Sequence, residues 1–260
     1  MNKMFVSISV SLLILALLVQ SSQALTVGVR VGDWFVYKGS LVLWEAGPSV
    51  PFPPHVFAAV IKEYNETEWY KYKVINVSRD VVTFEVITRW KNGTETKSTF
   101  DDNMTSSFTM MVIGANLEEG TVIRPEFDWT PIFGFDYKWP ERRLNQSIIV
   151  QFDGLEREVN VLDWLIPSPF GPPTTRQVYW WDKETGILAR YYINENGTDF
   201  ASGQSYKYVA VLDLIDTSRG WGAVIPENLN IGIILIGSAA MLVIGNNLRH
   251  KRIIKNSSRC

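Results

Sequence analysis

The feature that most constrains this chain is an uncharged run of 20 residues near its end, Leu229 to Leu248. An α-helix of that length measures about 30 Å, the thickness of the hydrocarbon layer of a bilayer. Five basic residues and no acidic residue follow the run: Arg249, Lys251, Arg252, Lys255 and Arg259. Because basic residues favour the cytoplasmic side, the sequence predicts a transmembrane helix over 229–248 and a cytoplasmic tail over 249–260. A buried helix of a soluble core is the alternative, but it does not explain the basic residues.

The amino end agrees with that orientation. Lys3 precedes an apolar stretch, Phe5 to Val19, and the sequence Ser22-Gln23-Ala24 fits the small-x-small rule for signal cleavage. An uncleaved first anchor is the alternative, and it would export the same central domain. The predicted organisation is a signal peptide (1–24), an exported domain (25–220), a juxtamembrane linker (221–228), the transmembrane helix and the tail. The chain is thus expected to be a single-pass type I protein of the cell membrane.

The exported part is acidic and has no thiol. Residues 25–228 hold all 27 Asp and Glu against 19 Lys and Arg, a formal charge of −8. A nucleic-acid partner is not expected, because nucleic acid requires a basic surface. The single cysteine is Cys260, in the tail, so the exported domain cannot form a disulfide and must depend on its core.

Glycosylation motifs are frequent in the exported part. Six of its ten asparagines begin an Asn-x-Ser/Thr sequence, which is more than chance predicts: Asn65, Asn76, Asn92, Asn103, Asn145 and Asn196. Such a motif marks a glycan on a solvent-facing site of an exported chain. Asn76 falls within a predicted strand, so it can carry a glycan only if its side chain points away from the core.

Alternating hydrophobicity predicts β-strands through most of this region. Apolar and polar residues alternate from Val82 to Trp90, and Asn92-Gly93 predicts a type I′ turn into a partner strand. The last third predicts a meander in which Gly186 and Gly197 occupy turns that need a positive φ. Pro-rich loops are expected over 47–54 and 167–173.

The predicted fold class is all-β and mainly antiparallel. At least eight strands and no long amphipathic helix are expected. This pattern is typical of a curved sheet, a barrel or a sandwich.

Four short motifs resemble archaeal cell-surface proteins of uncharacterised function. These motifs are Val31-Gly32-Asp33-Trp34, Asn116-Leu117-Glu118-Glu119-Gly120, Trp181 to Leu188, and Ile225-Pro226-Glu227 before the anchor. The resemblance implies an exported, glycosylated, membrane-tethered β-domain, and it brings no catalytic residues. The hairpin around Asp182 to Gly186 is also similar to one in bacterial periplasmic lipoprotein carriers, whose curved half-barrel holds acyl chains.

Catalytic motifs are absent from the sequence. The exported part has one histidine, His55, and no nucleophile elbow, zinc-binding motif or phosphate-binding loop. No catalytic residue, metal or cofactor is therefore predicted. Paired carboxylates leave a glycan-active enzyme as the alternative function.

An aromatic segment is the best candidate contact surface. Its predicted contact residues are Trp129, Phe133, Phe135, Tyr137 and Trp139, and Pro131 and Gly134 prevent it from being one regular strand. The rings either pack as core or loop cover, or form a groove for a sugar ring or an acyl chain. The expected function is a non-catalytic binding or envelope-structural role, with a lipid, a glycan or an envelope protein as partner.

Overall fold

The computed structural model describes residues 25–53, 59–107, 109–152, 154–168, 171–199 and 201–221. The predicted signal peptide, transmembrane helix and tail lie outside these ranges. The nine long strands are β1 (Trp34–Ala46), β2 (Thr67–Ser78), β3 (Val81–Trp90), β4 (Glu95–Asn103), β9 (Gln146–Phe152), β10 (Leu155–Ser168), β11 (Gly171–Asp182), β12 (Leu188–Thr198) and β13 (Ser205–Thr217). The short elements are β5 (Val122–Arg124), β6 (Phe127–Asp128), β7 (Lys138–Trp139), β8 (Arg142–Arg143), and the helices α2 (Ala59–Glu66) and α3 (Thr130–Phe133).

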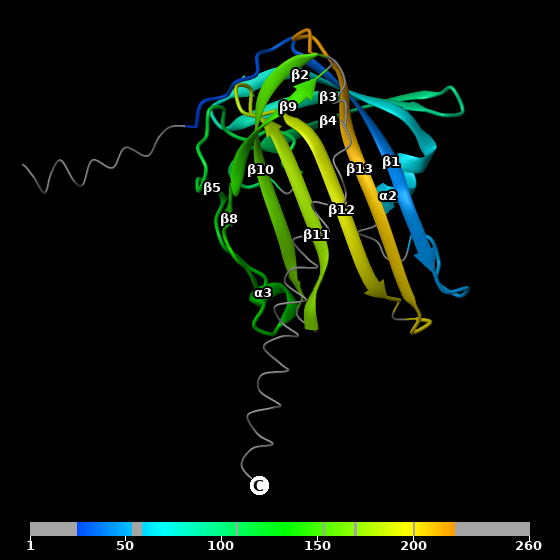
Figure 1. Ribbon diagram of the computed structural model, residues 1–260. Helices are drawn as coiled ribbons and strands as arrows, with labels where there is room; N and C mark the ends of the chain where they lie inside the picture. The colour runs from blue at the N-terminus through cyan, green and yellow to red at the C-terminus, as the bar shows by residue number, and fades with distance from the viewer. Residues whose placement is uncertain are drawn as a thin grey trace, which may run out of the picture.

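The nine long strands form one sheet in the order β4-β3-β2-β1-β13-β12-β11-β10-β9. Every pairing in it is antiparallel, which confirms the predicted class. Strands β4 and β9 end the order, so the sheet is open and does not close into a barrel. Figure 1 shows β1 and β10 to β13 side by side, with β2, β3 and β4 behind them.

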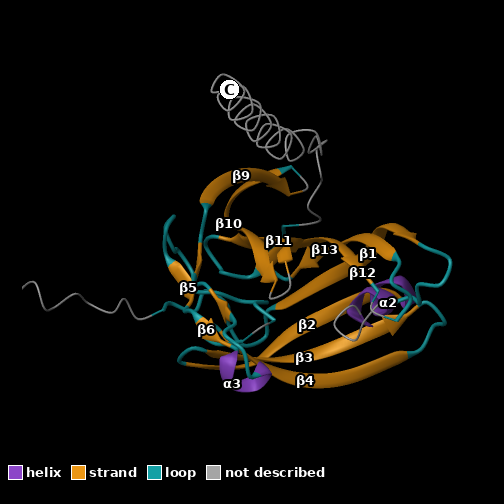
Figure 2. Cartoon of the chain, turned by 90° about the horizontal axis from the view of Figure 1, so that it is seen from below, coloured by secondary structure: helices purple, strands orange, loops and turns teal. Residues whose placement is uncertain are grey.

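The sheet bends sharply where β1 passes from one half to the other. β1 pairs with β2 only over Trp34–Tyr37, whereas it pairs with β13 from Phe35 to Ala46. Register shifts in β1 and β2 increase the local bend, as β-bulges do. The two halves separate beyond Tyr37, and α2 lies between them (Figure 2).

A glycine lets α2 pack against β1. A Cβ atom at Gly39 would lie 2.5 Å from the ring of Tyr64, which belongs to α2. Any larger residue at that position would push the helix away from the strand.

The concave face of the sheet carries the core. Opposite residues of neighbouring strands share a face, so one row crosses the sheet through Leu162, Tyr179, Tyr191, Leu212 and Gly39. Most of this row is buried, together with rings from β1 and β2. The interior is therefore occupied by packed side chains.

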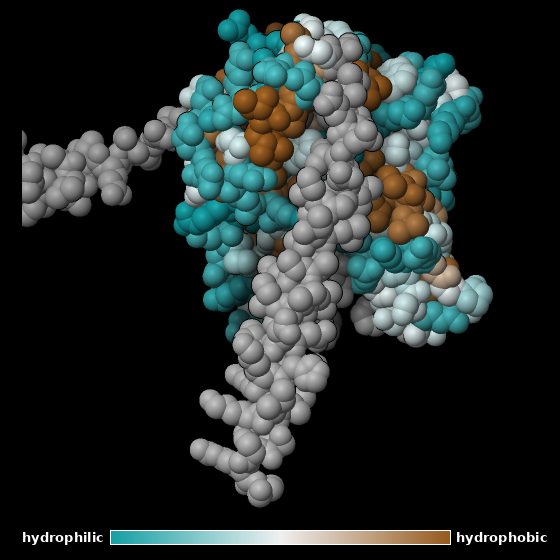
Figure 3. Space-filling model, in the orientation of Figure 1, coloured by the Kyte–Doolittle hydropathy of each residue, from teal (hydrophilic) through white to brown (hydrophobic). Residues whose placement is uncertain are grey.

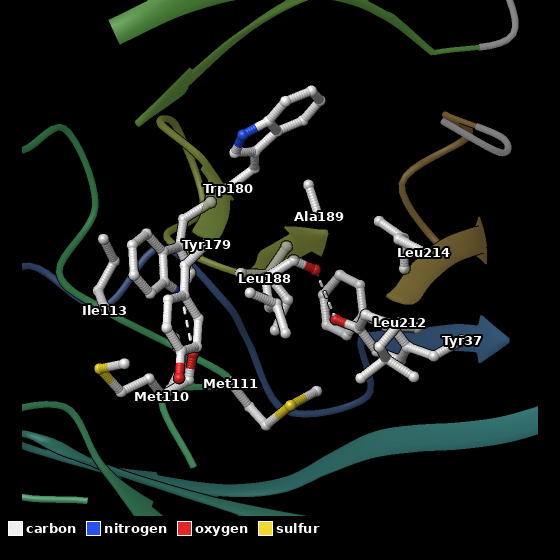
Figure 4. Packing of buried hydrophobic residues seen from close by; sticks show 14 of the residues in the cluster. Tyr37, Met110, Met111, Ile113, Tyr179, Trp180, Leu188, Ala189, Leu212 and Leu214 are labelled. Atoms are coloured by element: carbon white, nitrogen blue, oxygen red, sulfur yellow. Dashed lines mark hydrogen bonds between the residues drawn. The ribbon is translucent and has the colours of Figure 1, made fainter. Parts of the chain in front are cut away.

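A buried loop covers one end of this core. It contains the apolar run from Met110 to Ile113, which forms no named strand (Figure 4). The Nε1–H of Trp181 donates to the carbonyl of Met110 at 2.8 Å, and the backbone N–H of Leu188 donates to the carbonyl of Met111 at 2.8 Å. These bonds satisfy backbone carbonyl groups of the loop, which the surrounding side chains shield from water.

The turn predicted between β3 and β4 has a different type. The hairpin itself is confirmed, because Arg89 pairs with Glu95. Gly93 has a φ of +87° while Asn92 does not have a positive φ, and the N–H of Gly93 bonds to the carbonyl of Trp90. This is a three-residue loop with glycine in the left-handed position, so the type I′ prediction was wrong.

Two other predicted breaks are strand. Gly186 has a positive φ of +71°, as expected, but Gly197 continues β12 and pairs with Tyr206. A Cβ at Gly197 would lie 2.3 Å from the Tyr206 ring, so close packing explains this glycine. The predicted Pro-rich loop over 167–173 is largely the ends of β10 and β11, where the register is irregular near the prolines.

The surface carries both hydrophilic and hydrophobic residues. On the side of the molecule shown in Figure 3, most of the coloured surface is hydrophilic, and hydrophobic residues gather in separate brown areas. Exposed apolar side chains lie on several elements, among them Val42, Ile149 and Leu165.

Candidate aromatic binding surface

A long hairpin, which we call the arm, extends from Val122 to Arg143. Its stem is the pair β5 and β8, and its tip is β6, α3 and β7. Figure 1 shows β5 and β8 at the side of the sheet and α3 at the far end of the arm.

Local sequence explains the tip. Pro131 stands in the first turn of α3, where its missing N–H costs nothing, and Gly134 ends the helix at a φ of +75°. The carboxylate of Asp128 accepts the backbone N–H of Thr130 at 2.8 Å. Hydrogen bonds from the hydroxyl and the N–H of Thr130 lower the pKa of Asp128. Trp129 then donates its backbone N–H to Tyr137 and closes the tip.

Four rings form a continuous series, which we call the aromatic ladder: Phe127, Trp129, Trp139 and Trp164. Successive ring centroids are 4.7, 5.1 and 5.2 Å apart, and each pair meets edge to face. This is a favourable geometry for aromatic rings. Phe127 is 37% exposed and Trp164 is 8% exposed, so the ladder runs from solvent to the sheet.

The structure brings most of the predicted contact residues together. Trp129, Tyr137 and Trp139 are half-buried neighbours, and the Nε1–H of Trp139 donates to the hydroxyl of Tyr137 at 2.8 Å. Phe135 contacts Tyr137 with centroids 6.3 Å apart and is 39% exposed. Phe133 ends α3, and its side chain lies outside what the structure describes.

Two residues of this surface were missed by the sequence prediction. Trp164 belongs to β10, and its ring meets Trp139 from a distant part of the chain. Arg142 follows the aromatic segment by three residues, and its guanidinium lies 5.0 Å from the centroid of the Trp164 ring. Nothing local in the sequence indicates that contact, because it depends on how the arm packs against β10.

The stem carries two buried arginines side by side. Arg124 and Arg142 are opposite each other in the β5–β8 pair and are 1% and 6% exposed. Arg124 donates through Nε to the carbonyl of Ser107 at 3.0 Å and through Nη1 to the carbonyls of Met104 and Ile123. Burial lowers the pKa of both guanidinium groups. Their ordinary pKa is so high that both remain charged at neutral pH.

Two of the buried carboxylates, Asp102 and Glu195, accept hydrogen bonds from separate sets of donors. Asp102 accepts the Thr109 hydroxyl at 2.9 Å and the Val112 N–H at 3.0 Å. Glu195 accepts the hydroxyls of Tyr206 and Tyr208 at 2.6 and 2.9 Å. Both carboxylates are therefore engaged by hydroxyl or backbone donors of the fold.

Metal and histidine chemistry finds no support in the part of the chain that the structure covers. Among those residues no group of three or more His, Cys, Asp or Glu is arranged to hold a metal ion. The one exported histidine, His55, lies outside the described ranges.

Five of the six predicted glycosylation sites are exposed. Asn76 is among them, so its side chain meets the condition set above, and the others are Asn65, Asn92, Asn145 and Asn196. Asn103 differs, because it is half-buried and its Nδ2 donates to Asp80 at 3.2 Å. Its Oδ1 also accepts the N–H and the hydroxyl of Thr105.

Comparisons with known proteins name no relative. No protein-family model matches the chain, and a search of curated proteins returns no match. Among the helices in the described residues, none is both long and apolar enough to cross a bilayer.

Proposed function

We propose that this chain is a membrane-anchored, exported β-domain that binds a glycan on its aromatic arm, without catalysis. The observation that carries the proposal is the aromatic ladder, which runs from an exposed ring on the arm to a buried ring on β10. The strands of the arm form their own two-stranded sheets, and the contact of Trp139 with Trp164 joins the arm to the core of the nine-stranded sheet.

The tip favours contact with a ligand over simple packing. Ile132 is 64% exposed and Phe127 and Phe135 are more than a third exposed, although each is large and apolar. Exposed aromatic residues on a rigid frame lose little entropy on binding. Rings also offer flat apolar faces to a sugar, and the charged residues Glu126 and Lys138 stand beside them for hydrogen bonds.

A glycan fits this surface better than an acyl chain does. A lipid carrier would need space inside the curved sheet, but the middle rows of the concave face are packed with buried side chains and α2. The partly exposed rings of Phe127 and Phe135 lie instead on the arm, where a sugar can stack without entering the core.

The proposed topology comes from the ends of the chain. The apolar run 229–248, its basic tail and the signal-like amino end support an exported domain held at the membrane. The six Asn-x-Ser/Thr motifs support the same location.

Polysaccharide retention tests the binding surface. The full chain, purified in detergent, is passed over insoluble chitin, cellulose and immobilised polygalacturonate, and the retained fraction is measured. We expect retention on at least one support. The Phe127→Ala and Trp129→Ala variants should reduce it about tenfold, because each removes a stacking surface.

The matched control is Phe52→Ala. Phe52 is 36% exposed, close to the value for Phe127, and its ring contacts Trp44 away from the arm. This variant should retain the wild-type binding. Equal losses in the Phe52→Ala and Phe127→Ala variants would refute the assignment of binding to the arm, and release of shortened sugars from the support would identify an enzyme instead.

A further inference from the structure

The two arginines of the stem are buried, and neither forms an ion pair with any residue that the structure describes. No carboxylate oxygen within the described residues lies within 4.0 Å of either guanidinium, although ion pairs occur at many other arginines, such as Arg157 and Arg176. Two nitrogens, Nη2 of Arg124 and Nε of Arg142, are also buried there without a hydrogen-bond partner. Among the described residues, the side chain of Arg142 contacts the sulfur of Met110 at 3.7 Å and the face of Trp164.

The surrounding groups leave this region positively charged. Asp102 is the nearby buried carboxylate that acts on Arg124, and both of its oxygens already accept other donors. Tyr179 is the other titratable neighbour of the two arginines, and burial raises its pKa, so it stays neutral. Two guanidinium groups against one carboxylate give a local charge of +1.

Such an arrangement is costly unless something else supplies negative charge. Burying an ion without a partner costs several kcal/mol, and unsatisfied donors add to that cost. The two like charges also repel each other across the β5–β8 pair. Stability alone would favour an apolar side chain at one of these positions, so a positive charge retained here points to a ligand.

We propose that Arg124 and Arg142 form a binding site for an oxyanion, and that this anion is an acidic group of the glycan bound on the arm. Arg142 would contact the carboxylate, sulfate or phosphate group directly, and the charge of Arg124 would reinforce the contact. Guanidinium groups suit this role because their planar set of donors matches such oxygens.

The position of the site links it to the aromatic ladder. Arg142 stacks on Trp164, which is the inner ring of the ladder. A sugar on the outer rings would therefore direct a charged substituent toward the guanidinium at the inner end. The identity of the ligand as an acidic glycan rests on the proposed function, whereas the anion site does not.

The anion site is tested with inorganic sulfate. The melting temperature of the full chain in detergent is measured in millimolar sodium sulfate and in sodium chloride of equal ionic strength. We expect sulfate to raise it by about 3 °C, because a ligand that binds only the folded state stabilises it. The Arg142→Met variant should lose this response while melting no lower than the wild type in chloride, since it removes an unpaired buried charge.

Arg143→Met is the matched control. Arg143 is the next residue of β8, but its side chain is 53% exposed and pairs with Glu141. It should keep the sulfate response of the wild type. A response that is the same in the wild type and in the Arg142→Met variant, or no response in the wild type, would overturn the anion site.

Polygalacturonate and its methyl ester separate the two proposals, because the ester keeps the sugar backbone and replaces each charged carboxylate with a neutral group. The wild type should bind the acidic form about fivefold more tightly, and Arg142→Met should abolish that preference. The Trp129→Ala variant should weaken binding to both forms equally. If the wild type binds both forms alike and ignores sulfate, the anion site is wrong and the glycan function stands. If it binds neither form and is not retained on chitin or cellulose, but sulfate protects it through Arg142, the glycan function fails and the anion site stands.

Discussion

At the scale of single residues, glycines mark the positions where the backbone or a neighbour leaves no space for a side chain. Gly186 ends the turn after β11, with a φ of +71° and only 2.1 Å between an added Cβ and the carbonyl oxygen of Ile113. Its neighbour Asp182 accepts the N–H and the hydroxyl of Thr185 and fixes the same turn. The turn thereby joins the meander to the buried loop from Met110 to Ile113.

Gly186→Ala should destabilise the domain by roughly 3 kcal/mol or more. A positive φ alone costs an alanine about 1 kcal/mol, and the contact with a backbone oxygen cannot be relieved by a side-chain movement. Gly93→Ala is the control, because Gly93 has a φ of +87° with open space around it. Urea unfolding should show the smaller cost there, and equal costs in both variants would contradict the steric argument.

The sequence predicted the conformation of some of these glycines correctly and that of others wrongly. The glycine at position 186 and the hairpin around Gly93 follow from local turn chemistry, which a sequence contains. Gly197 was assigned to a turn because Asn-Gly pairs usually form one. The ring of Tyr206 requires a glycine there, and that contact joins two strands and is not visible in either one.

At the scale of elements, α2 packs between the two halves of the sheet where they separate. Its ring at Tyr64 lies on Gly39 of β1, and Tyr64 also meets Tyr70 of β2 at 6.2 Å. The helix therefore contacts both strands at the point where they separate.

Gly39→Ala should cost about 2 kcal/mol, because the added methyl group forces the Tyr64 ring away from β1. In the Tyr64→Ala background the same change should cost much less, since the ring is gone. A double-mutant cycle by urea unfolding measures this coupling. Additive costs would show that α2 does not depend on Gly39.

Burial decreases from Trp164 of β10, at the inner end of the ladder, to the tip of the arm. Trp164→Ala should cost roughly 3 to 5 kcal/mol, because its ring is buried. Phe135→Ala should cost less than about 1 kcal/mol, because its ring is 39% exposed at the tip. Calorimetry of both variants tests this gradient, and a large loss in Phe135→Ala would mean that the tip is structural.

The candidate surface was only partly predictable for a physical reason. Six aromatic residues in a segment broken by Pro131 and Gly134 cannot share one buried face, so a surface role for some of them followed from the sequence. Their contact with Trp164 and Arg142 depends on the packing of the arm against β10. Sequence spacing contains no information about that packing.

At the scale of the whole molecule, the sheet encloses many tyrosines on its concave face. Burial raises the pKa of eight of them: Tyr37, Tyr64, Tyr70, Tyr72, Tyr179, Tyr191, Tyr206 and Tyr208. Desolvation of the charged phenolate is the largest cause in each case. The same residues have an ordinary pKa of about 10 in the unfolded chain.

Alkali should therefore unfold the domain cooperatively. Stability from these tyrosines is complete below pH 10, because both states then hold their protons. Above pH 10 the unfolded chain releases protons that the folded chain retains, so each such tyrosine removes about 1.4 kcal/mol of stability per pH unit. Arg124 and Arg142 act in the opposite direction, because a lowered pKa stabilises the fold as pH rises, but they are two groups against eight.

Circular dichroism and tyrosinate absorbance, recorded together during an alkaline titration, test this expectation. The two signals should change in one transition, and Tyr191→Phe should move its midpoint to higher pH, because it removes one proton-releasing group. Tyrosinate absorbance that grows gradually from pH 10 while the circular dichroism stays native would mean that the concave face is open to water, and it would restore an internal ligand cavity as the competing function.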